Sequence, residues 1–199
     1  MIRGGQIRAE RGGQNWAENT TSQKTCDWCH APIILSSFRD IRAMALPKVN
    51  ECVNAYKKAL SEHPDNNDLN KSAALCFLKL KLYDMAIPAF QKALENNYTD
   101  AELYYDEAIC LLRGKKAFLG KRSDIDKAIE LLDAANSIDP KGIYYYFLAY
   151  IKYDFFERKS LNTSPSYQEC LLMQNNLAFL MKIINDLFTT LNVSLTSFS

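Results

Sequence analysis

A triplet of small, large and small side chains recurs in this chain at a spacing of 34 residues. The segments ECVNAYKKALSEHPDN and MAIPAFQKALENNYTD, which begin at Glu51 and Met85, align without a gap. The triplet consists of Cys52, Tyr56 and Ala59 in the first segment and of Ala86, Phe90 and Ala93 in the second. Intervals of four and three residues place a triplet on one stripe of a helix, where the small residues let a neighbouring helix approach closely. The period predicts a helical solenoid in which each repeat packs on its neighbours.

A third copy of the triplet lies further along the chain. The segment KAIELLDAANSIDPKG carries Ala128, Leu132 and Ala135 in the same phase, but it arrives eight residues late. We therefore expect extra residues between the two helices of that repeat. In the first and third copies a proline follows the last alanine by five residues, and Pro64 and Pro140 are expected to end their helices.

The segments that precede the triplets complete a repeat of two helices. Residues 70–84, 101–112 and 143–156 carry small and aromatic side chains at helical spacing. The matching positions are Ala73, Ala74 and Phe77; Tyr104, Ala108 and Leu111; and Tyr146, Ala149, Tyr150 and Tyr153. Over residues 33–156 the chain resembles the tetratricopeptide repeat (TPR) family, in which the triplet lies on the second helix of each pair. The resemblance implies an all-α, right-handed helical-hairpin solenoid of about three TPR-like repeats.

The chain departs from the family pattern at the start of its repeats. The tryptophan that is usual there is replaced by Asn70, Tyr104 and Tyr146. The first helix of the N-terminal repeat, residues 33–45, is degenerate, and we expect it to end before Pro47.

The rest of the chain divides by composition. Residues 1–24 are polar and lack apolar periodicity, so we expect a flexible tail. Residues 25–32 hold a CxxCH sequence, residues 33–166 the repeats, and residues 167–199 a hydrophobic segment that we expect to form capping helices at the C-terminal end. The lysine, acids and amides of that last segment would be costly in hydrocarbon, so no membrane span is expected.

The resemblance also implies where a partner would bind. In the family, the concave surface is formed by the first helix of each repeat. Our candidates for contacts with a protein or peptide partner are Lys71, Tyr105, Ile109, Arg113, Tyr144, Phe147 and Ile151. Residues 144–156 hold eight aromatic side chains, more than one core-facing stripe accommodates, and tyrosines with a few cations are typical of protein-binding surfaces. The alternative is that the C-terminal segment covers these rings within the chain.

Some TPR domains clamp the carboxylate of a peptide with lysine, asparagine and arginine side chains on successive first helices. At matching positions this chain carries Ser72, Glu102 and Asp106. Acidic side chains would repel an acidic peptide end, so we do not expect a carboxylate clamp.

The extra residues of the third repeat are basic. The segment LLRGKKAFLGKRSD, residues 111–124, carries five cations before its first acid. It either contacts an acidic partner or phosphate, or extends both flanking helices by about one turn with solvated tips. Only Phe118 is interleaved among the cations for base stacking, and the formal net charge of the chain is +1, so no nucleic-acid partner is expected.

The sequence TCDWCH places Cys26, Cys29 and His30 at a spacing used by haem attachment and zinc sites. Covalent haem needs export and a surrounding pocket, and the polar residues before Cys26 offer neither. A tetrahedral zinc site takes four ligands, and this motif supplies three. Two readings stay open: half of a zinc knuckle completed elsewhere, or a turn without metal before the first helix.

No catalytic constellation is recognisable in the sequence. The chain has two histidines and lacks a nucleophile elbow or a phosphate-binding glycine loop. The N-terminus has no signal-peptide pattern and four of the six cysteines stand singly in apolar stretches, so we expect a cytoplasmic protein. The expected function is that of a non-enzymatic scaffold or adaptor, a monomer or weak homodimer without a cofactor, that binds a peptide or a helix in its groove.

The alternative function is a zinc-dependent oligomerisation or regulatory module that acts through the CxxCH end. If two chains share one ion, the purified protein contains zinc at about half an equivalent per chain. Elemental analysis after dialysis, with a Cys26→Ser/Cys29→Ser variant as the control, tests this. A zinc content equal to that of the variant supports the turn without metal.

Overall fold

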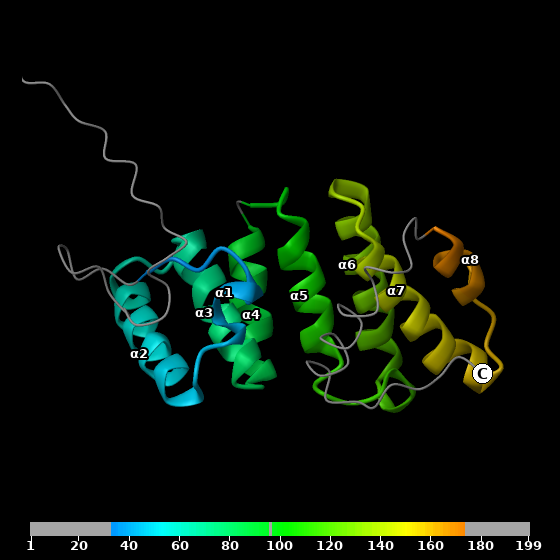
Figure 1. Ribbon diagram of the computed structural model, residues 1–199, viewed down its shortest axis with the longest axis horizontal. Helices are drawn as coiled ribbons and strands as arrows, with labels where there is room; N and C mark the ends of the chain where they lie inside the picture. The colour runs from blue at the N-terminus through cyan, green and yellow to red at the C-terminus, as the bar shows by residue number, and fades with distance from the viewer. Residues whose placement is uncertain (1–32, 96, 174–199) are drawn as a thin grey trace, which may run out of the picture.

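The computed structural model describes residues 33–95 and 97–173, and within them every regular element is a helix. The α-helices are α1 (Phe38–Arg42), α2 (Leu46–Glu62), α3 (Asn67–Lys79), α4 (Tyr83–Leu94), α5 (Ala101–Leu111), α6 (Arg122–Ile138), α7 (Gly142–Ile151) and α8 (Tyr167–Leu172). Three short helices complete the described chain: the 3₁₀ turns η1 (Ala117–Leu119) and η3 (Glu157–Lys159) and the π-helical turn η2 (Lys152–Phe156). From α2 to α8 the helices stand side by side along the long axis of the molecule (Figure 1).

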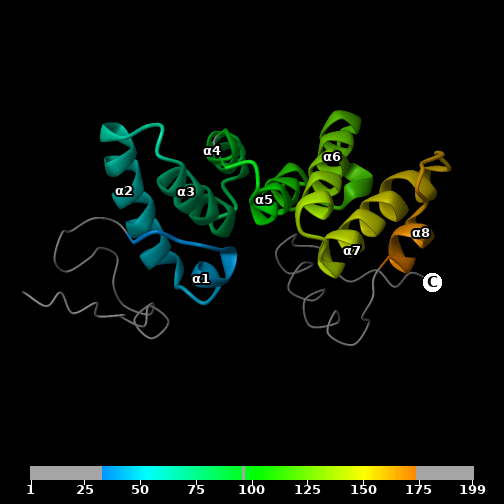
Figure 2. The ribbon, with the colours of Figure 1, turned by 90° about the horizontal axis from the view of Figure 1, so that it is seen from above.

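The helices form two layers. Seen from above, α1, α3, α5 and α7 lie on one side of the stack and α2, α4 and α6 on the other (Figure 2). Each helix from α2 to α7 packs against the next α-helix in the chain, and α3 also contacts α1 and α5. The predicted solenoid of helix pairs is therefore confirmed. We name the layer of α1, α3, α5 and α7 the first-helix layer.

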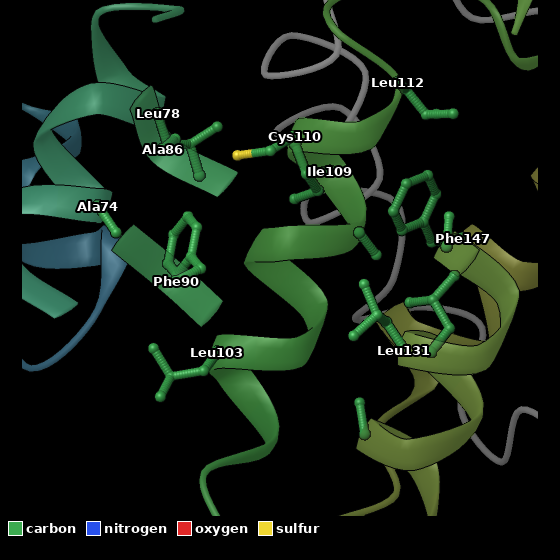
Figure 3. Close-up of a cluster of buried hydrophobic side chains, with 14 of the residues drawn as sticks. Ala74, Leu78, Ala86, Phe90, Leu103, Ile109, Cys110, Leu112, Leu131 and Phe147 are labelled. Carbon is green, nitrogen blue, oxygen red and sulfur yellow. The ribbon is translucent and has the colours of Figure 1, made fainter. Parts of the chain in front are cut away.

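The triplets that define the period lie in the core. Of the nine side chains in the three copies, eight are buried and Ala59 is partly buried. Phe90 of α4 lies between Ala74 of α3 and Leu103 of α5 (Figure 3). The small residues around each large one bring the helices together, and the aromatic or leucine side chain then fills the space between three helices.

The N-terminal helix is shorter than predicted. We expected a helix over residues 33–45, but α1 covers only Phe38–Arg42 and residues 33–36 are not helical. The backbone here bonds elsewhere: the Leu35 N–H donates to Ser72 Oγ at 2.9 Å, and the Tyr56 hydroxyl donates to the Ile33 carbonyl. These bonds hold the segment against α2 and α3. The expected end before Pro47 is confirmed, because α1 ends at Arg42 and Pro47 belongs to the first turn of α2.

Side-chain caps start the next two helices of the first-helix layer. Asn66 accepts a hydrogen bond from the Leu69 N–H at 3.0 Å, and Asp100 accepts one from the Glu102 N–H at 3.1 Å. Asn70, which occupies the position of the usual tryptophan, donates from Nδ2 to the carbonyl of Pro64 at 2.9 Å. A buried amide thus ties α3 to the turn before it.

The extra residues of the third repeat do not extend both flanking helices, which corrects one of our two readings. Helix α6 begins six residues before Ala128, whereas α4 begins three residues before Ala86, but α5 is not lengthened. Helix α5 ends at Leu111, the chain turns through Arg113 (φ 51°) and Gly114 (φ 66°), and α6 begins only at Arg122. We name residues 112–121 the insertion loop; it lies at the lower edge of the view in Figure 1. A side chain at Gly114 would meet the Tyr83 hydroxyl at 2.8 Å, so glycine suits both the conformation and the space.

The C-terminal part of the described chain changes its helical winding. Helix α7 continues directly into the π turn η2 at Lys152 and then into the 3₁₀ turn η3. Helix α8 packs back against α7. The start of α8 at Tyr167 coincides with the start of the predicted capping segment, and residues 174–199 lie outside the described residues. Among the described helices, none has the length and apolar character required to cross a membrane.

Replacing Phe90 by alanine tests the packing of the triplet. Phe90 is 0% exposed, so the variant leaves a cavity between three helices and is expected to lose about 3–5 kcal/mol of unfolding free energy. Urea unfolding followed by circular dichroism measures this. Met85→Ala, at a 39% exposed position of the same helix, is the control and should cost much less. Equal losses in the two variants would contradict the role assigned to the triplet.

Candidate protein-binding surface

The structure brings together predicted partner-binding residues from two repeats. Tyr105 of α5 lies against α7, with its ring centroid 4.9 Å from that of Tyr144 and 5.9 Å from that of Phe147. The second contact is edge-on, a favourable geometry for two aromatic rings. Residues that stand 39 and 42 positions apart in the sequence thus form one aromatic cluster in the first-helix layer.

Most of the predicted apolar contacts are buried. Ile109, Tyr144, Phe147 and Ile151 are all between 0 and 3% exposed. Tyr105 is half-buried. The eight aromatic side chains between residues 144 and 156 follow the same trend, since six are buried and the other two are half-buried. Of the aromatic cluster, Tyr105 therefore retains the most contact with solvent.

Ion pairs connect the N-terminal end of α5 with its neighbours in the layer. Lys71 of α3 contacts Asp100 at 2.5 Å, and its side chain is 13% exposed. Lys141, directly before α7, contacts Glu102 at 3.3 Å with both side chains about 40% exposed. Exposed pairs of the second kind contribute little to stability.

Asp106 is a buried acid beneath these ion pairs. It is 5% exposed. Burial, together with the nearby carboxylates of Glu102 and Asp100, raises the pKa of Asp106 well above its ordinary value, and the Lys71 ammonium opposes part of this effect. The next residue, Glu107, is also buried, and burial raises its pKa although Gln91 donates a hydrogen bond to it at 3.1 Å.

Burial also raises the pKa of Tyr144, the tyrosine that contacts Tyr105. The pKa of its hydroxyl is raised to about 12, although the nearby Lys141 opposes part of this increase. The Lys141 ammonium lies 5.6 Å from the centre of the Tyr144 ring, a distance suited to a cation–π contact. Tyr144 is thus neutral at physiological pH, and its ring rather than its charge shapes the surface.

Arg113 does not join this cluster. It lies at the start of the insertion loop, is exposed, and pairs with Asp84 of α4. This separation results from the insertion, which turns the chain away from the helix axis at Arg113.

The sequence analysis missed a third buried acid, Asp154. It is 1% exposed and accepts a hydrogen bond from the Phe118 N–H at 2.8 Å, while Arg158 forms an ion pair with it. Its signal in the sequence is an acid among aromatic residues, in the run YDFF. Such a residue is rarely left without a partner when it is buried.

The predicted zinc ligands Cys26, Cys29 and His30 lie outside the described residues. Among residues 33–95 and 97–173, no group of histidine, cysteine, aspartate and glutamate side chains is arranged to hold a metal ion. The zinc site and the cytoplasmic location stay predictions from the sequence.

Known structures share this all-helical fold. A crystal structure of MamA covers 92% of its own chain and 80% of this one with a TM-score of 0.54 at 19% identity. MamA from AMB-1 aligns over 74% of both chains with a TM-score of 0.54 at 16% identity. A MamA fragment from Desulfovibrio magneticus RS-1 covers 77% of this chain and 72% of that chain with a TM-score of 0.50 at 18% identity.

No protein-family model and no curated protein sequence matches the chain. At identities below one fifth the likeness to MamA concerns the fold alone. The TPR resemblance therefore rests on the period, the triplets and the arrangement of helix pairs.

The buried acid Asp106 predicts a pH dependence of stability. Because the pKa of Asp106 is raised in the folded chain, its contribution favours folding at low pH and is lost as the pH rises above about 3.9, the value of an unfolded aspartate. The asparagine of Asp106→Asn does not titrate, so this variant does not lose the contribution. The difference between its melting temperature and that of the wild type is therefore expected to increase from acidic to neutral pH. Thermal unfolding across this range measures the difference, and Glu62→Gln at the exposed end of α2 should show no comparable trend.

Proposed function

We propose that the chain is a non-enzymatic protein-interaction module that holds a peptide or a helix of a partner against the first-helix layer. The observation that carries this proposal is the cluster of Tyr105, Tyr144 and Phe147 between α5 and α7, with ion pairs beside it. Aromatic side chains in a polar surround are the usual anchors of protein interfaces.

The burial of the cluster determines the role of each ring. Tyr144 and Phe147 are held from all sides and form a rigid floor. Tyr105 packs against these two rings and is itself only half-buried. A partner side chain that packs on Tyr105 meets a surface that is already ordered, so binding loses little side-chain entropy there.

The neighbouring charges determine the orientation of a partner. Lys71 of α3 pairs with Asp100, and Lys141, directly before α7, pairs with Glu102 of α5. Cations and acids that lie side by side favour a partner segment in which the charges alternate in the opposite sense. This proposal replaces the sequence expectation that all seven predicted residues contact the partner directly, and it assigns Ile109, Tyr144, Phe147 and Ile151 to the support of the surface.

A single substitution at Tyr105 tests the surface without changing the buried rings of Tyr144 and Phe147. Random displayed peptides are selected on the wild-type chain, and the affinity of the selected peptides is then measured by fluorescence anisotropy. Tyr105→Ala is expected to lower this affinity by about tenfold or more, as the loss of an anchor residue does.

Tyr104→Ala is the matched control for this experiment. Tyr104 is also half-buried on α5, but its hydroxyl donates to the Tyr98 carbonyl at 3.0 Å, away from the cluster. The control should retain the affinity of the wild type. Selection that yields no peptide, or an equal loss in both variants that remain folded by circular dichroism, would contradict the proposed function.

A further inference from the structure

We propose that the insertion loop forms a second binding surface, which takes an acidic segment of a partner protein. This surface, the basic tip, consists of Lys115, Lys116 and Lys121 of the loop together with Arg158 and Lys159 of η3. It lies at the ends of α5 and α7 and not on the aromatic cluster, so this proposal does not depend on the function proposed above.

The loop is held by a buried acceptor. The Phe118 N–H donates to Asp154 Oδ2 at 2.8 Å, and the Ala117 N–H donates to the Tyr150 hydroxyl at 3.3 Å. Ala117 itself is fully buried. Asp154 and Tyr150 stand more than thirty residues further along the chain. Two backbone bonds to another part of the fold keep the loop in one conformation, so a partner would not have to order it on binding.

Phe118 brings cations from distant parts of the sequence together. The guanidinium of Arg158 lies 4.7 Å from the centre of its ring, and the ammonium of Lys159 lies 4.8 Å from it. Lys159 also lies 3.7 Å from the centre of the Phe155 ring. Cation–π contacts fix these two side chains beside the loop. The charge of Arg158 is paired with Asp154, so Lys159 contributes the available positive charge of η3.

The lysines of the loop differ from Arg113 and from Arg122, which directly follows the loop. Arg113 pairs with Asp84 and Arg122 with Asp126. Lys115, Lys116 and Lys121, in contrast, form no ion pair or hydrogen bond through their side chains within the described residues. The positive charge of the three lysines is therefore available to a partner.

The chemistry around these lysines favours an acidic polypeptide. Leu119 lies between them in the sequence and is 67% exposed, so an acidic segment with apolar side chains would match both the charge and this contact. Nucleic acid fits less well, because the Phe118 ring already contacts two cations and is not available for base stacking. A membrane surface fits less well too, since Leu119 is the one strongly exposed large apolar residue of the loop.

The test uses the full chain and two labelled peptides. The first is a repeat of the triplet Glu-Glu-Leu, and the second is the matching repeat of Gln-Gln-Leu, which has the same length and apolar content without the charge. Fluorescence anisotropy is expected to show binding of the acidic peptide, at least about tenfold weaker binding of the neutral one, and weaker binding of the acidic peptide as salt increases.

Two charge-reversal variants locate the binding site. Lys115→Glu/Lys121→Glu is expected to weaken binding of the acidic peptide by about tenfold or more. Lys57→Glu/Lys58→Glu reverses two exposed lysines on α2 and so changes the net charge of the chain by the same amount. This matched control should bind the acidic peptide nearly as well as the wild type. Circular dichroism confirms that both variants remain folded.

Several results would contradict the proposal that the basic tip binds an acidic segment. Equal losses in the two variants would show that only net charge matters, and equal binding of the two peptides would exclude recognition of acidic side chains. If neither peptide binds, an acidic polypeptide with apolar side chains is excluded as the partner. A short DNA duplex, or vesicles of phosphatidylcholine and phosphatidylserine, bound more tightly than the acidic peptide in a Lys115- and Lys121-dependent manner would assign the surface to another partner. None of these results bears on peptides that depend on Tyr105.

Discussion

The close approach of helices at the small residues of each triplet is the constraint on which the rest of the structure depends. An alanine on either side of Phe90 lets α3 and α5 approach α4 closely enough for the ring to fill the space between them (Figure 3). The same arrangement recurs around Tyr56 and Leu132, both of which are buried. Because each large side chain contacts neighbouring helices, its position sets the distance between successive pairs, and the two layers follow from it.

A solenoid built in this way tolerates an insertion where two helices of a pair are joined. The extra residues between α5 and α6 leave the triplet of α6 in its place, with Ala128, Leu132 and Ala135 all fully buried. The insertion nevertheless acquires contacts of its own, since Asp154 accepts a backbone hydrogen bond from it. A buried carboxylate needs several donors, and the loop and Arg158 supply them. The π turn at Lys152–Phe156 is the segment that carries this acid.

The two proposed surfaces use different physical chemistry. The aromatic cluster consists of two buried rings and the half-buried Tyr105, with ion pairs beside it. The basic tip offers unpaired lysines on an anchored loop beside two cations held by Phe118. One surface would select a partner mainly by shape and apolar contact, and the other mainly by charge. A scaffold with both could hold two segments of one partner or two partners at once, which is the use that an elongated stack of helices favours.

The sequence by itself determined the helical repeats, the buried triplets and the extra residues of the third repeat, because helical periodicity is a local property that a spacing of three and four residues reveals. The repeat also placed Tyr105, Tyr144 and Phe147 on the first helices of successive repeats, but the contacts between their rings were decided by the tertiary structure. The short first helix, the path of the insertion loop and the burial of Tyr144, Phe147, Asp106 and Asp154 were decided only by the tertiary structure. These features depend on contacts between segments that stand far apart, such as the 36 residues between Phe118 and Asp154, and no local pattern specifies which distant group a side chain or a backbone amide will meet.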